Sequence, residues 1–306
     1  MKVYEFNYSK KFSCIADKCQ HNCCKGWQII VDTKTIKKYL CLKDNDKRFN
    51  QCFDQQTFKL VDGVCPFLNS DGLCHVIKNY GEKLLCKTCK THPRFKSFFN
   101  DRTETGLGLY CEHAGKIILS FKPKMKAVLI KDDLKAIKLS AFERKVLRFR
   151  KNALDIVQNR TLCITKKISL LIELANINLN KNSFNKWLDV FKSLDKLEIN
   201  EFSFERISPA KNFNDLINGF EREYEQLLSY LIFRHLSRAI DQLDLRVRLA
   251  FVLLSFNMIN HILSCSVKKD FETLVEVCRF YSSEIETNDD NIYRLLNEIE
   301  NLINFI

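Results

Sequence analysis

The chain has 306 residues, of which 46% are hydrophobic and 28% charged, and its formal net charge is +12. This composition excludes a disordered chain, because enough apolar side chains are present to build a sizeable core. No uncharged apolar run reaches the roughly 18 residues of a membrane span, and the charged start lacks the apolar stretch of a secretion signal. We therefore expect a cytoplasmic protein with no membrane partner.

The charge balance is basic, with 49 Lys and Arg residues against 37 Asp and Glu. A basic face attracts nucleic acid, an acidic protein or an anionic cofactor. No zinc-finger, homeodomain or RNA-binding signature accompanies this charge, so nucleic acid is the least favoured of these partners. A solvated basic face without a partner is the plain alternative.

Glycine and proline divide the chain into two regions. Seven of the eight glycines precede residue 116, and three of the four prolines precede residue 124. Turn-rich chain therefore gives way to helix-compatible chain near Lys122-Pro123-Lys124. The sequence predicts a mainly α fold, in which a small, irregular, cysteine-rich domain with few short strands (1–122) is joined to an all-helical domain (123–306).

Hydrophobic periodicity predicts the elements of both regions. In the first region, 27–32 and 117–121 predict strands and 34–40 a short helix. In the second, apolar residues from Leu139 to Val157 follow helical spacing, after an offset stripe from Ile130 to Ala141 with a break near Ser140. Further helices are expected at 165–177, 183–196, 213–240, 244–264, 268–284 and 289–304. Their caps include Asn182, Asn212 and Asn288.

The cysteines are concentrated in the first region, where eleven of the fourteen lie between Cys14 and Cys111. Thiols of cytosolic proteins stay reduced, so a dense local group indicates metal binding. The motifs are Cys14-x4-Cys19-x3-Cys23-Cys24, Cys65-x8-Cys74, Cys86-x2-Cys89-x2-His92-Pro93-Arg94 and Cys111-Glu-His113. The remaining three, which lie in apolar surroundings, are expected to be buried core residues: Cys163, Cys265 and Cys278.

The spacing of the cysteines indicates which kind of metal centre they suit. Tetrahedral zinc usually takes paired C-x2–4-C knuckles, and Cys86/Cys89 is the tightest such pair. Adjacent Cys23 and Cys24 cannot easily bind one mononuclear ion in good geometry. This favours an iron–sulfur cluster, with zinc as the alternative metal.

The pattern F-x-C-x4-C-x3-CC-x-G-W-x-I, from Phe12 to Ile29, resembles the flagellin lysine-N-methylase (FliB) family, within the wider group of zinc- or iron-chelating cysteine-cluster proteins. The later cysteine motifs continue the resemblance over residues 12–115, and 230–235 is the helical segment most similar to the family. The resemblance implies a [4Fe–4S] enzyme that methylates lysine side chains of flagellin with S-adenosylmethionine. The metal ligands it implies are Cys14, Cys19, Cys23, Cys24, Cys65, Cys74, Cys86 and Cys111. Three cysteines fall outside the family pattern: Cys41, Cys52 and Cys89.

Methylation requires a deprotonated lysine amine, because the amine, with a pKa of about 10.4, is protonated at neutral pH. The candidate bases are Tyr110, Glu112 and His92, with Asp32 and His113 also near the cysteines. Each of these side chains has a purely structural role as its alternative.

The sequence also offers two candidate cofactor contacts. Arg94 is expected to hold the carboxylate of S-adenosylmethionine or to neutralise thiolates, and Trp27 to pack over its cation or close the core. Gly106-Leu-Gly108 is too short for a dinucleotide loop, so a doubly wound methyltransferase fold is not expected. The alternative function is a non-catalytic iron- or zinc-binding module.

Overall fold

The computed structural model describes residues 1–26, 29–132, 137–178, 184–197, 200–209, 216–302 and 304–305. These residues form two compact units. The cysteine unit comprises 13–95 with 111–113, and the helical unit comprises 1–12, 96–110 and 114–306. The division therefore does not fall at residue 122, since the N-terminal strand and the segment before Cys111 belong to the helical unit.

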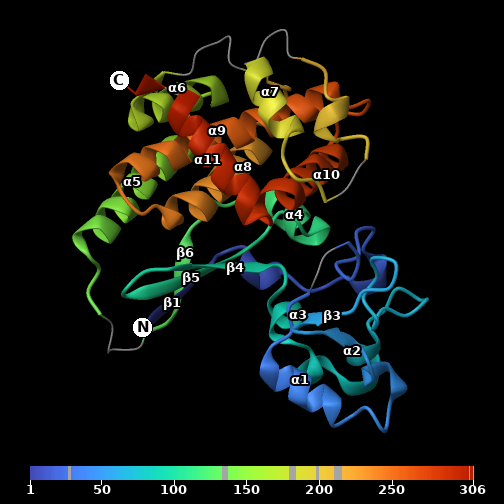
Figure 1. Ribbon diagram of the computed structural model, residues 1–306. Coiled ribbons are helices and arrows are strands. Elements are labelled where there is room, and N and C mark those ends of the chain that lie inside the picture. Colours follow the sequence, from blue (N-terminus) through green and yellow to red (C-terminus); the bar gives the residue numbers. More distant parts are fainter. Residues whose placement is uncertain are drawn as a thin grey trace. The chain divides into compact units, whose positions relative to one another are not determined.

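The helical unit is built from long helices, shown from green to red in Figure 1. They are α5 (Ala141–Val157), α6 (Ile164–Ala175), α7 (Phe184–Lys192), α8 (Glu221–His235), α9 (Gln242–Cys265), α10 (Phe271–Tyr281) and α11 (Asp289–Leu302). A π-helix, Ser282–Glu286, continues α10. The prediction of a mainly α chain is confirmed, and the predicted helices are present with shifted bounds. The helix predicted at 213–240 begins only at Glu221, because 216–220 are not helical and 213–215 lie outside the described residues.

Local signals explain where several helices begin. Ser140 caps α5 in a capping box, in which Glu143 N–H donates to Ser140 Oγ at 3.0 Å and Ser140 N–H donates to Glu143 Oε2 at 2.6 Å. The predicted break near Ser140 is therefore a helix start. Asn288 Oδ1 accepts from Asp290 N–H and Asn291 N–H at the start of α11, as predicted. Asn182 and Asn212 lie outside the described residues.

The centre of the helical unit is α9, which packs against α6, α8, α10 and α11. By length and hydropathy this helix is able to cross a membrane, but 83% of its apolar window is buried inside the protein. Its neighbours thus occupy the surface that lipid would otherwise cover. Leu249, Phe251 and Ile259 are completely buried.

A four-stranded sheet with the order β4-β5-β1-β6 was not predicted. Its strands are β1 (Lys2–Phe6), β4 (Arg94–Phe98), β5 (Arg102–Leu107) and β6 (Ala127–Lys131). β1 pairs in parallel with β5, Val3 opposite Thr103, and antiparallel with β6, Phe6 opposite Ala127. The expectation of an all-helical second domain is therefore wrong for 127–131. A further pair joins β7 (Ile177–Asn178) to β8 (Asn304–Phe305).

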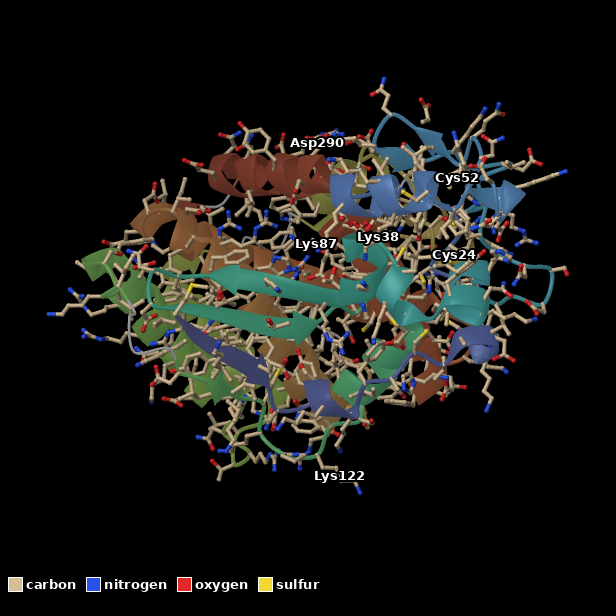
Figure 2. All side chains as sticks on the ribbon, turned by 90° about the horizontal axis from the view of Figure 1, so that it is seen from below. Cys24, Lys38, Cys52, Lys87, Lys122 and Asp290 are labelled. Atoms are coloured by element: carbon tan, nitrogen blue, oxygen red, sulfur yellow. The ribbon has the colours of Figure 1, made fainter. Side chains whose placement is uncertain are left out.

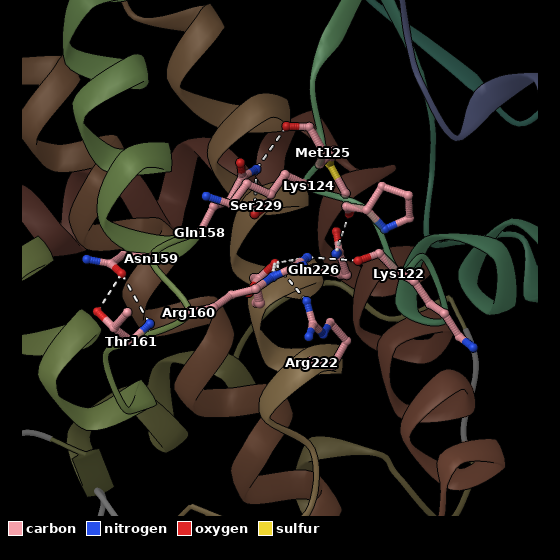
Figure 3. A network of polar contacts seen from close by, with 12 residues as sticks. Lys122, Lys124, Met125, Gln158, Asn159, Arg160, Thr161, Arg222, Gln226 and Ser229 are labelled. Carbon is pink, nitrogen blue, oxygen red and sulfur yellow. Dashed lines mark hydrogen bonds and ion pairs between the residues drawn. The ribbon is translucent and has the colours of Figure 1, made fainter.

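Buried charges in the helical unit are paired. Glu225 is 2% exposed and accepts from Arg160 at 2.9 Å, with Lys167 and Arg222 each 3.7 Å away. Figure 3 shows Arg160 and Arg222 of this network, and near them Gln158. Arg160 also donates to the carbonyl of Lys122, and Gln158 donates to that of Met125. The network ties α6 and α8 to the segment before β6.

The cysteine unit has little regular structure. Its elements are α1 (Thr33–Leu40), α2 (His75–Tyr80), α3 (Lys87–Thr91) and the pair β2 (Phe53–Asp54) and β3 (Thr57–Phe58). Its core is a group of aromatic rings with centroids about 5–6 Å apart around Tyr39, Phe49, Phe58 and Phe67. The predicted helix 34–40 is confirmed as α1.

Two strand predictions fail or lie partly outside the described residues. Residues 117–121 are not a strand, because α4 (Glu112–Leu119) extends into them and buries Ile118 and Leu119. A short apolar run does not distinguish a strand from a buried helix turn. Of the predicted strand 27–32, residues 27 and 28 lie outside the described residues, and Ile30 makes only an isolated bridge to Thr57.

Candidate metal centre and neighbouring residues

Backbone pairing brings cysteines that are distant in sequence together in the cysteine unit. Gly26 N–H donates to Gly63 O at 2.9 Å and Cys65 N–H donates to Cys24 O at 2.8 Å, so the first two cysteine motifs lie side by side. Gly26 and Gly63 both have positive φ, which favours glycine at these turns. A bridge between Leu68 and Cys74 closes the second motif.

Six thiols there each interact with at least one other, and we call them the thiol cluster: Cys23, Cys24, Cys65, Cys74, Cys86 and Cys89. Cys24 hydrogen-bonds to the sulfurs of both Cys23 and Cys65. Cys86 caps α3, and Cys89 N–H donates to its sulfur at 3.5 Å. Cys65, Cys86 and Cys89 also interact electrostatically. The structure shows no disulfide among the described residues.

Hydrogen bonds between these thiols lower the pKa of some of them and raise the pKa of others. The hydrogen bond from Cys24 lowers the pKa of Cys23 to about 7 and lowers the pKa of Cys65, while that of Cys24 is raised. In the same way the bond from Cys89 lowers the pKa of Cys86 to about 7 and raises that of Cys89. The cluster therefore carries sulfurs that lose protons easily, and thiolates are the ligands of soft metals.

The donor set fits a thiolate-bound metal by its chemistry, but it is not a closed single-ion site. In the described part of the chain, no group of three or more His, Cys, Asp or Glu side chains is arranged to hold a metal ion. Four sulfurs on one zinc, with Zn–S bonds of about 2.3 Å, crowd around one point.

The other predicted ligands are Cys14, Cys111 and Cys19, and Cys19 also interacts electrostatically with Cys23. Cys19 donates its thiol to His21 O at 3.1 Å and to Glu112 Oε2 at 3.7 Å, and burial raises its pKa to about 11. Cys14 is exposed, and its sulfur accepts from Ala16 N–H. Cys111 is half-buried immediately before α4.

Cys89 is the cluster member that the family pattern omitted, although its C-x2-C spacing with Cys86 was visible in the sequence. Of the three cysteines expected in the core, only Cys278 is buried. Cys163 and Cys265 are exposed, because Cys163 is the N-cap of α6 and Cys265 the last residue of α9.

The three candidate bases have different surroundings. Glu112 is 6% exposed, and its Oε2 accepts from Gln20 N–H at 3.0 Å, which fixes the loop between Cys19 and Cys23. Burial lowers the pKa of His92 to about 4, so its imidazole is neutral at neutral pH. The ring of Tyr110 lies so close to Gly108 that a Cβ there would be 2.1 Å from it. Gly108 of the short G-x-G thus makes room for a ring.

Asp32 is a helix cap. Its carboxylate accepts from Thr35 N–H, Thr35 Oγ1 and Lys87 N–H at 2.9–3.0 Å, and the bond from Lys87 is the main cause of its lowered pKa. It therefore joins α1 to the start of α3. Arg94 is half-buried at the first position of β4, and His113 lies in the first turn of α4. Trp27 lies outside the described residues.

Together the structure defines a mainly α protein with a cysteine unit whose thiols converge. The chain is 34% identical over 130 residues to the flagellar biosynthetic protein FliU of Salmonella muenchen, which covers 39% of this chain and 77% of FliU. It is 33% identical over 130 residues to the lysine-N-methylases of Salmonella typhimurium and Salmonella choleraesuis, again over 39% of this chain. The chain belongs to this lysine-N-methylase (FliB) family.

The match spans only 32% of the length of the two lysine-N-methylases. No family model matches the chain. No solved structure matches it either.

Proposed function

We propose that this protein transfers methyl groups from S-adenosylmethionine to lysine side chains of flagellin, and that its thiol cluster binds a [4Fe–4S] centre. The observation that carries the proposal is the convergence of six thiols in a member of the lysine-N-methylase family. Flagellin as the substrate is favoured by the flagellar name of FliU. A cytoplasmic location fits a step that acts on flagellin before it is exported.

The residues that would hold the iron–sulfur centre are those of the thiol cluster, with Cys23, Cys65 and Cys86 the sulfurs that deprotonate most easily. Held by these residues, such a centre would supply a Lewis-acidic iron to which the amino-acid end of S-adenosylmethionine could bind. Arg94 is the cation we assign to the carboxylate of that cofactor.

The lysine amine must lose its proton before it attacks the methyl sulfonium. Glu112 is held by Gln20, and His92 is a weak base because burial lowers its pKa to about 4. We therefore assign deprotonation to solvent and to desolvation of the amine, and keep Tyr110 as the one candidate base. Activity should rise with pH, because the neutral fraction of an amine with a pKa of about 10.4 grows roughly tenfold per unit.

The experiment incubates the anaerobically purified full chain with flagellin and S-adenosylmethionine and measures lysine methylation by mass spectrometry. The expected result is methyl groups on flagellin lysines, more of them at higher pH. Flagellin from cells with and without the gene is the matched comparison. Unmodified lysines in both, from protein that carries its metal, would leave only the metal-binding module. Zinc in place of iron, with methylation intact, would replace the [4Fe–4S] part of the proposal and keep the enzyme.

A further inference from the structure

Four lysines line a pocket of about 240 Å³ in the cysteine unit. Lys34 and Lys38 come from α1, and Lys87 and Lys90 from α3. Figure 2 shows Lys38 and Lys87 side by side. The rest of the lining is Asp32, Thr35, Leu85 and Thr91.

The positive charge of this pocket is not balanced from within the unit. Among the described residues, no ion pair engages Lys34, Lys38 or Lys87, and Lys90 Nζ donates to a neutral carbonyl, Lys83 O, at 2.8 Å. Asp32, the one acid of the lining, already accepts three hydrogen bonds from two helix starts. Several like charges around one hollow attract an anionic group.

The other polar groups of the lining are already used. Thr35 Oγ1 donates to Asp32 and Thr91 Oγ1 donates to Lys87 O. What the pocket presents is therefore flexible ammonium groups beside one apolar side chain, Leu85, which is half-buried. Ammonium groups on flexible stems suit carboxylates that arrive in varied orientations.

We propose that this pocket docks an acidic segment of the protein substrate, with its carboxylates on Lys34, Lys38 and Lys87 and a neighbouring apolar side chain on Leu85. The lining holds no aromatic ring on which a base would stack and no arginine, so single-stranded nucleic acid is the poorer fit. The inference rests on the proposed function only in taking the partner to be a protein.

The test measures binding of a fluorescent peptide rich in Glu and Leu to the full chain, by anisotropy at low and moderate salt. Its controls are the same peptide with Gln for Glu and a single-stranded oligonucleotide. The variant is Lys34→Glu/Lys38→Glu/Lys87→Glu, and the matched control is Lys43→Glu/Lys47→Glu/Lys59→Glu, three exposed lysines of the same unit outside the pocket. Both variants change the net charge equally.

The expected result is that the Glu peptide binds, that salt weakens it, and that the pocket variant loses roughly tenfold or more in affinity while the control variant keeps it. Equal loss in both variants, equal binding of the Gln peptide, or stronger binding of the oligonucleotide at the same lysines would overturn the proposal. Peptide binding needs neither S-adenosylmethionine nor turnover. Binding without methylation of flagellin would thus refute the proposed function alone, and methylation by a pocket variant with unchanged KM would refute the docking site alone.

Discussion

In the helical unit, buried charge meets opposite charge. Glu104 is 1% exposed and receives two hydrogen bonds from Arg150, and Glu286 accepts from Tyr230 and His235. In the cysteine unit the buried polar atoms are sulfurs that face one another, over a core of aromatic rings. In the first arrangement the buried carboxylates find their partners among protein groups. The second leaves several ionisable thiols sharing protons, which a metal would satisfy and the protein by itself does not.

This difference predicts that metal loss acts on one unit only. Cys65→Ser and Cys89→Ser should strip the metal and unfold the cysteine unit, because lost thiolates open the coordination shell of a small core. Exposed Cys163→Ser should keep both metal and fold. Metal content and limited proteolysis measure the effect, and we expect cleavage within 13–95 while α8 and α9 stay protected. Cleavage spread evenly over both units would contradict the prediction that metal loss unfolds the cysteine unit alone.

The paired charges of the helical unit should be costly to break singly. Glu104→Ala leaves Arg150 buried against the rings of Phe99 and Phe233, at 5.7 and 5.0 Å, and should cost about 3–5 kcal/mol in urea unfolding. Asp155→Ala, which removes an exposed pair with Lys151, should change stability by less than about 0.5 kcal/mol. Similar shifts for the two variants would mean that the burial of the Glu104 pair contributes nothing.

The same unit should lose stability in acid. Burial lowers the pKa of His235, so the imidazole stays neutral. Its Nε2–H donates to Glu286 at 2.7 Å. A second proton on Nδ1 would find no acceptor there, because this atom has no hydrogen-bond partner. Burial alone would raise the pKa of Glu286, but the bonds from His235 and Ser282 and the charge of Arg234 hold it below its usual value.

Both folded pKa values are depressed, so the unfolded state binds more protons and stability is lost as pH falls. The part of the folding stability that depends on His235 declines as pH falls below about 6.5, and the part that depends on Glu286 declines below about pH 4.3. His235→Gln should therefore flatten the decline of unfolding free energy between about pH 7 and pH 5, measured by urea titration. If the unfolding free energies of the variant and the wild type fall in parallel, His235 is not the source of the pH dependence.

A smaller effect is expected where the segment before Cys111 folds back. Gly108→Ala must displace the Tyr110 ring and should cost about 1–3 kcal/mol. Gly115→Ala, in α4, meets Val275 at an ordinary 3.5 Å and should be neutral or slightly stabilising. Thermal unfolding of the two variants decides this, and equal melting temperatures would show that the Tyr110 ring yields freely.

The sequence predicted the helices because their signals are local: α5 shows apolar periodicity, and α9 is a long apolar run that is buried on nearly every side. It did not predict the sheet, whose strands β1, β5 and β6 come from three distant segments with no shared local signal. The run Ile117–Phe121 misled because buried helix turns and strands share β-branched residues.

The difference between local signals and contacts between distant segments also explains which parts of the candidate site were predicted. The family resemblance implied eight cysteine ligands, and five of them belong to the thiol cluster: Cys23, Cys24, Cys65, Cys74 and Cys86. Their role as metal ligands stays a prediction, as it does for Cys14, Cys19 and Cys111. The structure adds Cys89 through its place one turn into α3. The contact of Glu112 with Gln20 spans 92 residues, so no local pattern could reveal it.

The central claim is that the thiol cluster binds an iron–sulfur centre, and the most direct measurement is the iron and acid-labile sulfide content of protein purified without oxygen, with its absorption spectrum. We predict brown protein with iron and sulfide in nearly equal amounts, both lost in Cys65→Ser and retained in Cys163→Ser. Colourless wild-type protein that carries stoichiometric zinc would contradict the claim.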